Sequence, residues 1–198
     1  KLIYHNFDYD LLPKNAAFKI RLFHQLEFFF SKQFDFLIFP SIERAKLFSK
    51  ITNIHKSKFY VLQNCFSKKF KPIKSSKFEN FLIENKLKNK KIICRMGTIG
   101  PNHFIEESIK AFNFLEENNI LIIAGVEVDN YTAYLNNLIK SLELNKKIFI
   151  LKNIDNDLWF EILNKSNLGL CFYERNFLSH QFMAGTSTKF NNYIFANL

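Results

Sequence analysis

A short turn with two glycines is the part of this sequence whose residue types suit anion binding. It contains Gly97, Thr98, Gly100, Pro101 and Asn102, between an apolar run and a segment with helical spacing. Glycine lets a backbone approach a ligand closely, and proline suits the first position of a helix. The free N–H groups and the dipole of such a helix start would face an anion such as a diphosphate. The turn is neither a dinucleotide-binding fingerprint nor a Walker loop, so a Gly-Pro connection without a ligand stays as the alternative.

Two apolar runs and a helix must position this turn. Residues 92–94 and 120–124 are short continuous apolar runs, which are typical of strands buried on both faces. Residues 104–116, between them, place apolar and acidic side chains on opposite sides of a helix. The pattern predicts a right-handed βαβ unit with the turn at the carboxyl end of its first strand.

The same alternation extends over the rest of the chain. Further strands are predicted at residues 2–4, 36–39, 59–62, 148–151 and 168–172. Further helices are predicted at residues 15–32, 41–48, 78–87, 131–142, 155–163 and 188–196. Strands and helices that alternate at this spacing predict an α/β fold with a doubly wound, parallel, Rossmann-like sheet.

Ligands of doubly wound sheets lie beyond the carboxyl ends of the strands. Four segments follow predicted strands at such ends: residues 97–103, 125–129, 152–155 and 173–189. We therefore expect these segments to line one cleft.

The composition is that of a globular chain of 198 residues, with 47% hydrophobic and 23% charged residues. Its net charge of +10 would suit nucleic acid or an anionic membrane. The lysines are spread along the chain, however, and no nucleic-acid-binding motif interleaves them with aromatic residues. The sequence therefore predicts a solvated basic surface and no nucleic-acid partner. It contains no signal peptide and no 18-residue apolar run, so no membrane-spanning segment is predicted.

The segment 15–32 raises the question of membrane contact. It carries Phe18, Leu22, Leu26, Phe29 and Phe30 at helical spacing. A helix packed on the core with a solvated face is favoured over an interfacial helix, which needs exposed apolar surface. Peripheral contact with the inner face of the plasma membrane is kept open for this basic protein.

The cysteines predict neither a disulfide framework nor a metal site. Cys65, Cys94 and Cys171 lie far apart in the sequence, a spacing that indicates buried free thiols in a reducing, cytoplasmic compartment. The chain begins without an initiator methionine and ends within a helical pattern. We therefore expect it to be part of a longer protein.

Seven segments, in order, resemble the C-terminal half of family 4-like glycosyltransferases with the GT-B fold. They are residues 35–41, 61–64, 96–100, 109–112, 121–125, 167–170 and 187–193. The resemblance implies three parts. Residues 1–64 would be the truncated end of the acceptor-side domain. Residues 65–77, rich in Lys and Ser, would form a linker, and residues 78–198 a truncated nucleotide-sugar donor-binding domain.

The resemblance implies transfer of a sugar from a nucleotide-diphosphate sugar to a glycan or lipid-linked acceptor, in polysaccharide or glycoconjugate biosynthesis. No metal and no cofactor beyond the donor substrate would be needed. The implied donor-binding residues are Gly97, Thr98, Gly100, Asn102, His103, Gly125, Asn153, Ser187, Thr188, Lys189 and Asn192. Glu174 and His180, in the loop after the last strand, are the candidates for catalysis.

The chain departs from the family pattern at three positions. The family commonly carries two glutamates eight residues apart, where this chain has Ala184 and Asn192. Asparagine still binds a ribose hydroxyl, but through weaker, neutral hydrogen bonds. The basic residue after the glycine turn is also missing, and His103 stands nearest to its position.

Two other classes of function stay open beside the glycosyltransferase. One is a nucleotide-sugar epimerase with a similar fold, and the other is a degenerate, non-catalytic binding module. The leading hypothesis predicts nucleoside-diphosphate binding that Gly97→Asp and Lys189→Ala both weaken.

Overall fold

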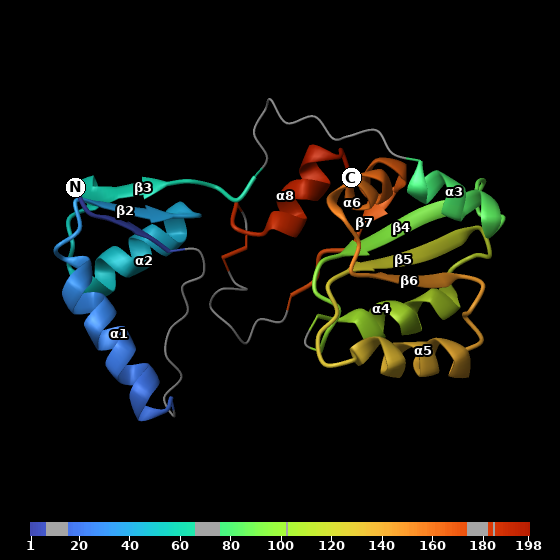
Figure 1. The fold of residues 1–198 in the computed structure, drawn as a ribbon, viewed down its shortest axis with the longest axis horizontal. Helices are drawn as coiled ribbons and strands as arrows, with labels where there is room; N and C mark the ends of the chain where they lie inside the picture. Colours follow the sequence, from blue (N-terminus) through green and yellow to red (C-terminus); the bar gives the residue numbers. More distant parts are fainter. Residues whose placement is uncertain (7–15, 66–75, 102, 174–181, 184) are drawn as a thin grey trace. The chain divides into compact units, whose positions relative to one another are not determined.

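A computed structural model describes residues 1–6, 16–65, 76–101, 103–173, 182–183 and 185–198 (Figure 1). The chain divides into two compact units. The first comprises Lys1–Cys65 and Arg175–Asn191, and the second Phe66–Glu174 and Asn192–Leu198. The division into 1–64, 65–77 and 78–198 stays a prediction. Residues 66–75 of the expected linker lie outside the described residues, and residues 175–191 group with the first unit.

The first unit contains a three-stranded parallel sheet. Its strands are β1 (Ile3–His5), β2 (Phe36–Phe39) and β3 (Phe59–Val61), in the order β1-β2-β3. Helix α2 (Ile42–Thr52) connects β2 to the 3-10 turn η1 (Lys56–Lys58). Ser41 caps α2, because its hydroxyl accepts a hydrogen bond of 3.2 Å from the Arg44 N–H. The core beneath α2 is aromatic, with Phe39 and Phe48 fully buried.

Helix α1 (Phe18–Ser31) differs from the expected core-packed helix. It contacts its unit through His24, Glu27, Phe28 and Ser31, of which only Ser31 is fully buried. Glu27 accepts a hydrogen bond from the Tyr4 hydroxyl, and the Phe28 ring packs edge-on against Phe48. The large apolar side chains lie on the other faces and are exposed. The prediction that these apolar side chains pack on the core was therefore wrong.

The second unit contains a four-stranded parallel sheet in the order β6-β5-β4-β7. The strands are β4 (Lys91–Met96), β5 (Asn119–Gly125), β6 (Ile148–Lys152) and β7 (Leu168–Gly169). Strand β5 extends the sheet on one side of β4, and β7 returns to the other side. The order of strands therefore reverses beside β4, which is the switch point where α/β sheets bind ligands.

Helices cover both faces of this sheet (Figure 1). On one face, α4 (Ile105–Ala111), the 3-10 turn η2 (Phe112–Phe114) and α5 (Tyr131–Ser141) bury residues such as Ile109, Leu121 and Leu135. On the other face, α3 (Lys77–Glu84), α6 (Asn156–Lys165) and the end of α8 (Thr188–Phe195) cover Cys94, Met96 and Ile122. Two apolar layers on a continuous apolar sheet confirm the predicted Rossmann-like α/β class.

The helix after the glycine turn begins later than expected. Pro101 lies in the turn, and α4 starts at Ile105 after Phe104 adopts a left-handed conformation with φ 52°. A residue in that conformation interrupts a right-handed helix, so the expectation of Pro101 at the first helical position was wrong. Asp155 caps α6 through a 2.9 Å hydrogen bond from the Leu158 N–H.

All three cysteines are free, as expected, but they are not all buried. Cys94 is buried in β4, Cys171 is half-buried beyond the end of β7, and Cys65 is exposed. Burial raises the pKa of the Cys94 thiol to about 11, so this thiol stays protonated near neutral pH.

Candidate functional site

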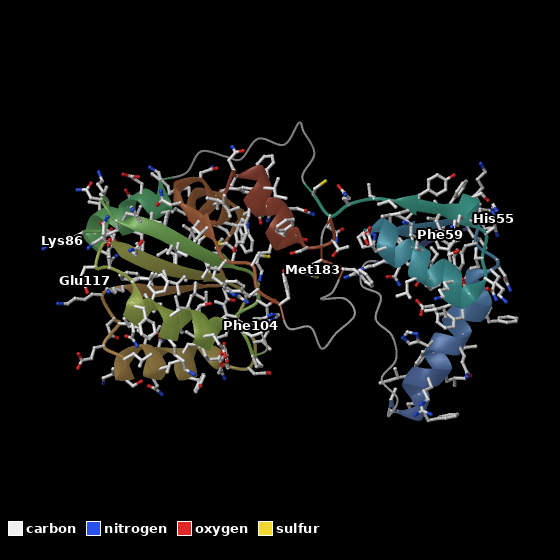
Figure 2. All side chains as sticks on the ribbon, turned by 180° about the vertical axis from the view of Figure 1, so that it is seen from behind. His55, Phe59, Lys86, Phe104, Glu117 and Met183 are labelled. Atoms are coloured by element: carbon white, nitrogen blue, oxygen red, sulfur yellow. The ribbon has the colours of Figure 1, made fainter. Side chains whose placement is uncertain are left out.

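The loops that follow β4, β5 and β6 meet at the carboxyl edge of the second sheet. Phe104 lies at this edge, whereas Lys86 and Glu117 lie at the opposite, amino edge (Figure 2). The parallel register explains why these loops meet, since Met96 pairs with Ala124, and Gly125 pairs with Lys152. Each strand therefore ends within one or two residues of its neighbour.

Two glycines let the first two loops touch backbone to backbone. Gly97 donates a 2.9 Å hydrogen bond to the Ala124 carbonyl and has φ 114°. Gly125 has φ 150°, and a Cβ on it would lie 1.8 Å from the Gly97 carbonyl oxygen. A side chain at Gly125 would therefore force the loops apart, and the φ of Gly97 would strain any residue with a Cβ.

Further hydrogen bonds join the three loops into one surface. The Ile99 N–H donates to the Val126 carbonyl at 2.8 Å, and the Val128 N–H donates to Ile99 at 3.0 Å. The Asn153 N–H donates to the Gly125 carbonyl at 2.7 Å. The structure thus brings the predicted residues Gly97, Gly125 and Asn153 together at one edge.

The predicted donor-binding residues of the segment 97–103 differ in exposure. Thr98 is exposed, His103 is half-buried and Gly100 is buried. Asn102, Glu174, His180 and Ala184 lie outside the described residues. The roles proposed for Asn102, Glu174 and His180 therefore stay predictions.

The start of α4 is a weaker anion site than the sequence suggested. Glu106 and Glu107 occupy its first turn, where their negative charge already opposes the positive end of the helix dipole. Glu106 is held there by a hydrogen bond from the Tyr131 hydroxyl. An anion at this edge therefore needs a source of positive charge other than the dipole.

Arg95 is such a source, and sequence reasoning missed it. Its side chain is on the α4 and α5 face of β4, because Cys94 and Met96 point to the other face. Only 2% of Arg95 is exposed, and burial lowers the pKa of its guanidinium. One guanidinium nitrogen, Nη1, donates to the Thr98 carbonyl, while Nε and Nη2 have no hydrogen-bond partner within the described structure.

The Arg95 guanidinium thus places a buried positive charge directly behind the glycine turn. None of the carboxylates that the structure describes pairs with Arg95. A buried charge is costly, and groups with perturbed pKa values cluster at functional sites. The sequence does contain a signal for Arg95, because an arginine interrupts an otherwise apolar run there.

Tyr193 ties α8 to the switch point. Its hydroxyl accepts a 2.8 Å hydrogen bond from the Met96 N–H and donates to the Leu170 carbonyl at 3.1 Å. Gly169 makes room for the ring, since a Cβ there would come within 2.7 Å of it. Asn192, the predicted ribose-binding residue, is adjacent to this anchor and is only 3% exposed.

The residues before Asn192 belong to the first unit. Ser187 caps α8 by accepting a 3.1 Å hydrogen bond from the Phe190 N–H. Ser187 and Lys189 are buried and Thr188 is exposed. The roles of Ser187, Thr188 and Lys189 in donor binding stay predictions, because Thr98 belongs to the other unit.

Asn64 secures the segment that leads into α8. Its side-chain Nδ2 donates to the Thr186 carbonyl at 3.0 Å, and its own carbonyl accepts a 2.7 Å hydrogen bond from Asn191 Nδ2. The sequence placed Asn64 at the end of a strand but assigned it no partner.

An apolar cavity of about 740 Å³ lies between α4 and the segment after β7. Its lining includes Ile93, Phe112, Leu168, Leu170 and Phe172. An apolar wall offers little to a diphosphate, so this cavity is not a candidate for an anion site.

Two further properties concern the part of the chain that the structure describes. Among those residues, no group of three or more His, Cys, Asp or Glu side chains is placed to hold a metal ion. None of their helices combines the length and the apolar character that crossing a membrane requires.

Comparison with known proteins finds one family that the second unit resembles. Residues 76–172 match the family described as "Glycosyl transferases group 1". The match includes β4 to β7 and therefore the three loops at the carboxyl edge. No curated protein sequence matches the chain significantly.

Solved structures with the same fold are GT-B glycosyltransferases. Anabaena Alr3699/HepE in complex with UDP and glucose is 16% identical, with a TM-score of 0.67 over 87% of this chain and 46% of that one. WaaG, a glycosyltransferase involved in lipopolysaccharide biosynthesis, is 17% identical, with a TM-score of 0.65 over 99% of this chain and 54% of that one.

A third solved structure carries a donor analogue. It is an Escherichia coli protein described as "Trehalose-6-phosphate", bound with UDP-2-fluoro glucose, and is 13% identical with a TM-score of 0.67. The match covers 98% of this chain and 50% of the Escherichia coli chain. The chain thus spans about half the length of the solved structures it matches. At these identities the likeness shows the fold, and the predicted GT-B class is confirmed.

Proposed function

We propose that this chain, which belongs through residues 76–172 to the glycosyl transferases group 1, binds the donor of a glycosyltransferase. The donor would be a nucleoside-diphosphate sugar, and the structural neighbours solved with UDP or UDP-sugars make UDP the first nucleotide to test. The acceptor would be a glycan or a lipid-linked glycan, bound by a part of the protein other than the second unit.

The backbone contact between Gly97 and Gly125 is the observation that carries this proposal. It keeps side chains away from the carboxyl edge beside β4, where a ligand's phosphates can approach main-chain N–H groups. Arg95 lies behind the same turn and adds positive charge. A glycine-lined surface with a buried cation suits a diphosphate better than a neutral ligand.

The proposed chemistry follows from these groups. The acceptor hydroxyl would attack the anomeric carbon of the sugar while the bond to the diphosphate breaks. The leaving diphosphate gains negative charge in the transition state, and the turn and Arg95 would stabilise that charge without forming a covalent intermediate. Asn192 would hydrogen-bond a ribose hydroxyl, as the family resemblance implies for its position.

Thr98→Asp tests the location of the site. Thr98 is exposed and tolerates substitution, whereas Gly97 has a φ of 114° that an aspartate would strain. A carboxylate at this position would repel the diphosphate by about 1–3 kcal/mol, which weakens UDP affinity about fivefold or more. Titration calorimetry with UDP and UDP-glucose on the full chain would measure this effect.

Thr98→Asn is the matched control, because it has the same size as Thr98→Asp without the charge. It should bind UDP within about threefold of the unaltered chain, a difference of well under 1 kcal/mol. Equal UDP affinity in the aspartate and asparagine variants would remove the proposed diphosphate site.

A non-catalytic binding module is the second candidate, and Asn192 favours it. A neutral, buried side chain occupies the position where the family commonly has a glutamate. Incubation with a radiolabelled donor and analysis of the products separates the three possibilities. Transfer or hydrolysis of the sugar indicates a glycosyltransferase, a changed sugar on the nucleotide indicates an epimerase, and binding without turnover indicates the module.

A further inference from the structure

A second pocket, of about 420 Å³, opens at the amino edge of the second sheet, where Lys86 and Glu117 lie (Figure 2). Its volume lies within the usual range for small-molecule sites, about 300–1,000 Å³. Part of its wall is apolar, and its polar lining consists of Lys86, Lys88, Asn89, Lys90 and Asn118. Three ammonium groups and two side-chain amides therefore surround one recess.

The backbone holds the lysines of this pocket in place. Lys86 follows the end of α3 with φ 58°, the left-handed conformation in which many helices end. The Leu87 N–H closes the turn by donating to the Leu82 carbonyl at 2.7 Å. Leu87 is only 4% exposed, so it fixes the turn to the core between Lys86 and Lys88. The ammonium groups thus extend from an anchored turn.

Two of the three ammonium groups have no carboxylate partner among the described residues. Lys86 forms no ion pair there. The Lys90 ammonium donates to the Glu117 carbonyl at 2.8 Å, and that acceptor carries no charge. Only Lys88 lies near a carboxylate, at 3.5 Å from Glu79, and this exposed contact is of little strength. The recess therefore keeps a net positive charge.

Acidic residues adjoin the lining of the pocket and interrupt the positive charge around it. The Glu117 side chain is 86% exposed, and its carboxylate pairs with Lys147 at 3.1 Å. Glu84, the last residue of α3, and Glu116 are exposed as well. A nucleic acid or an anionic membrane laid over this edge would meet these carboxylates. A small anion inside the recess would meet the ammonium groups instead.

The lining residues indicate the chemistry of such an anion. Ammonium groups bind phosphate oxygens as point charges, through charge-assisted hydrogen bonds. The side chains of Asn89 and Asn118 make no hydrogen bond within the described structure. Because an amide both donates and accepts, these two groups suit hydroxyls.

We propose that the pocket at the amino edge binds a small molecule that carries both a phosphate monoester and hydroxyl groups, such as a sugar phosphate. The phosphate would lie between Lys86 and Lys90, and the hydroxyls near Asn89 and Asn118. This site is at the opposite edge of the sheet from the proposed donor site, and it does not depend on nucleotide binding.

Nuclear magnetic resonance of the isotope-labelled full chain tests the proposal, with glucose 6-phosphate as the probe and excess UDP present to occupy the proposed donor site. The amide signals of residues 86–90 and 118 should shift and reach saturation. Glucose should not shift them, and inorganic phosphate should bind about fivefold more weakly than glucose 6-phosphate. Because these signals report where the probe binds, the result is the same whether or not the chain binds UDP.

Lys86→Gln should weaken the binding of glucose 6-phosphate about fivefold, since it removes one charged contact at an exposed position. Lys140→Gln is the matched control, because it removes the same charge from an exposed position of α5 in the same unit. Asn118→Ala should weaken glucose 6-phosphate and leave inorganic phosphate unchanged.

Three results would overturn the proposal. One is a set of amide signals at residues 86–90 and 118 that does not saturate with glucose 6-phosphate. Another is equal affinity for glucose 6-phosphate in Lys86→Gln and Lys140→Gln. The third is inorganic phosphate that binds as tightly as glucose 6-phosphate, which would mean attraction of any anion to surface lysines.

Discussion

At the scale of single residues, Arg95 distinguishes a functional arrangement from a merely stable one. A buried guanidinium with two unpartnered nitrogens weakens the fold relative to an apolar side chain of similar size. Its hydrogen bond to the Thr98 carbonyl nevertheless fixes the glycine turn. Stability and donor binding should therefore respond differently when Arg95 is replaced.

Arg95→Met should separate the two properties. Methionine fills the space without a charge, so the free energy of unfolding should fall by less than about 1 kcal/mol or rise. UDP affinity should fall about tenfold, because the turn loses a charge-assisted hydrogen bond and the site loses a cation. Urea denaturation and titration calorimetry measure these quantities. Arg95→Lys retains the charge and should lose less affinity for UDP. If Arg95→Met lost stability and UDP affinity in parallel, the role of Arg95 would be structural only.

At the scale of elements, the docking of α8 depends on one hydroxyl. Tyr193 satisfies the Met96 N–H at the end of β4 and the Leu170 carbonyl after β7. Burial raises the pKa of Tyr193, so its hydroxyl stays protonated and able to donate. The helix that carries Asn192 is thereby held at the switch point.

Tyr193→Phe should lower the free energy of unfolding by about 1–3 kcal/mol, because two buried backbone groups lose their partner. Urea denaturation followed by circular dichroism measures the change. Tyr134→Phe removes a hydroxyl from a side chain that is 52% exposed and should change stability by less than about 0.5 kcal/mol. Equal stability of the two variants would show that the Tyr193 hydrogen bonds are dispensable.

At the scale of the whole molecule, residues far apart in sequence complete the first unit. Asn64 bonds to Thr186 and Asn191, more than 120 positions away. Contacts of this range cannot be inferred from local spacing, and they group residues 175–191 with the first unit.

Asn64→Ala should loosen the start of α8 without unfolding the chain. It removes the 3.0 Å hydrogen bond to the Thr186 carbonyl, which contributes about 1 kcal/mol. Amide hydrogen exchange in a peptide that includes Ser187 and Asn191 should accelerate about fivefold. Asn113→Ala, at an exposed position of the second unit, is the control. Unchanged exchange in Asn64→Ala would show that the Asn64 side chain does not hold this segment.

The sequence alone determined the α/β class and the strands around the glycine turn. Those features depend on local periodicity and on side chains within a few residues of each other. Only the tertiary structure decided that Gly125 must be a glycine, because the Gly97 carbonyl occupies the space of its Cβ. The same holds for Arg95 behind the turn and for the apolar outer face of α1. Burial and clashes are set by the neighbours that folding brings together, and a local pattern does not contain them.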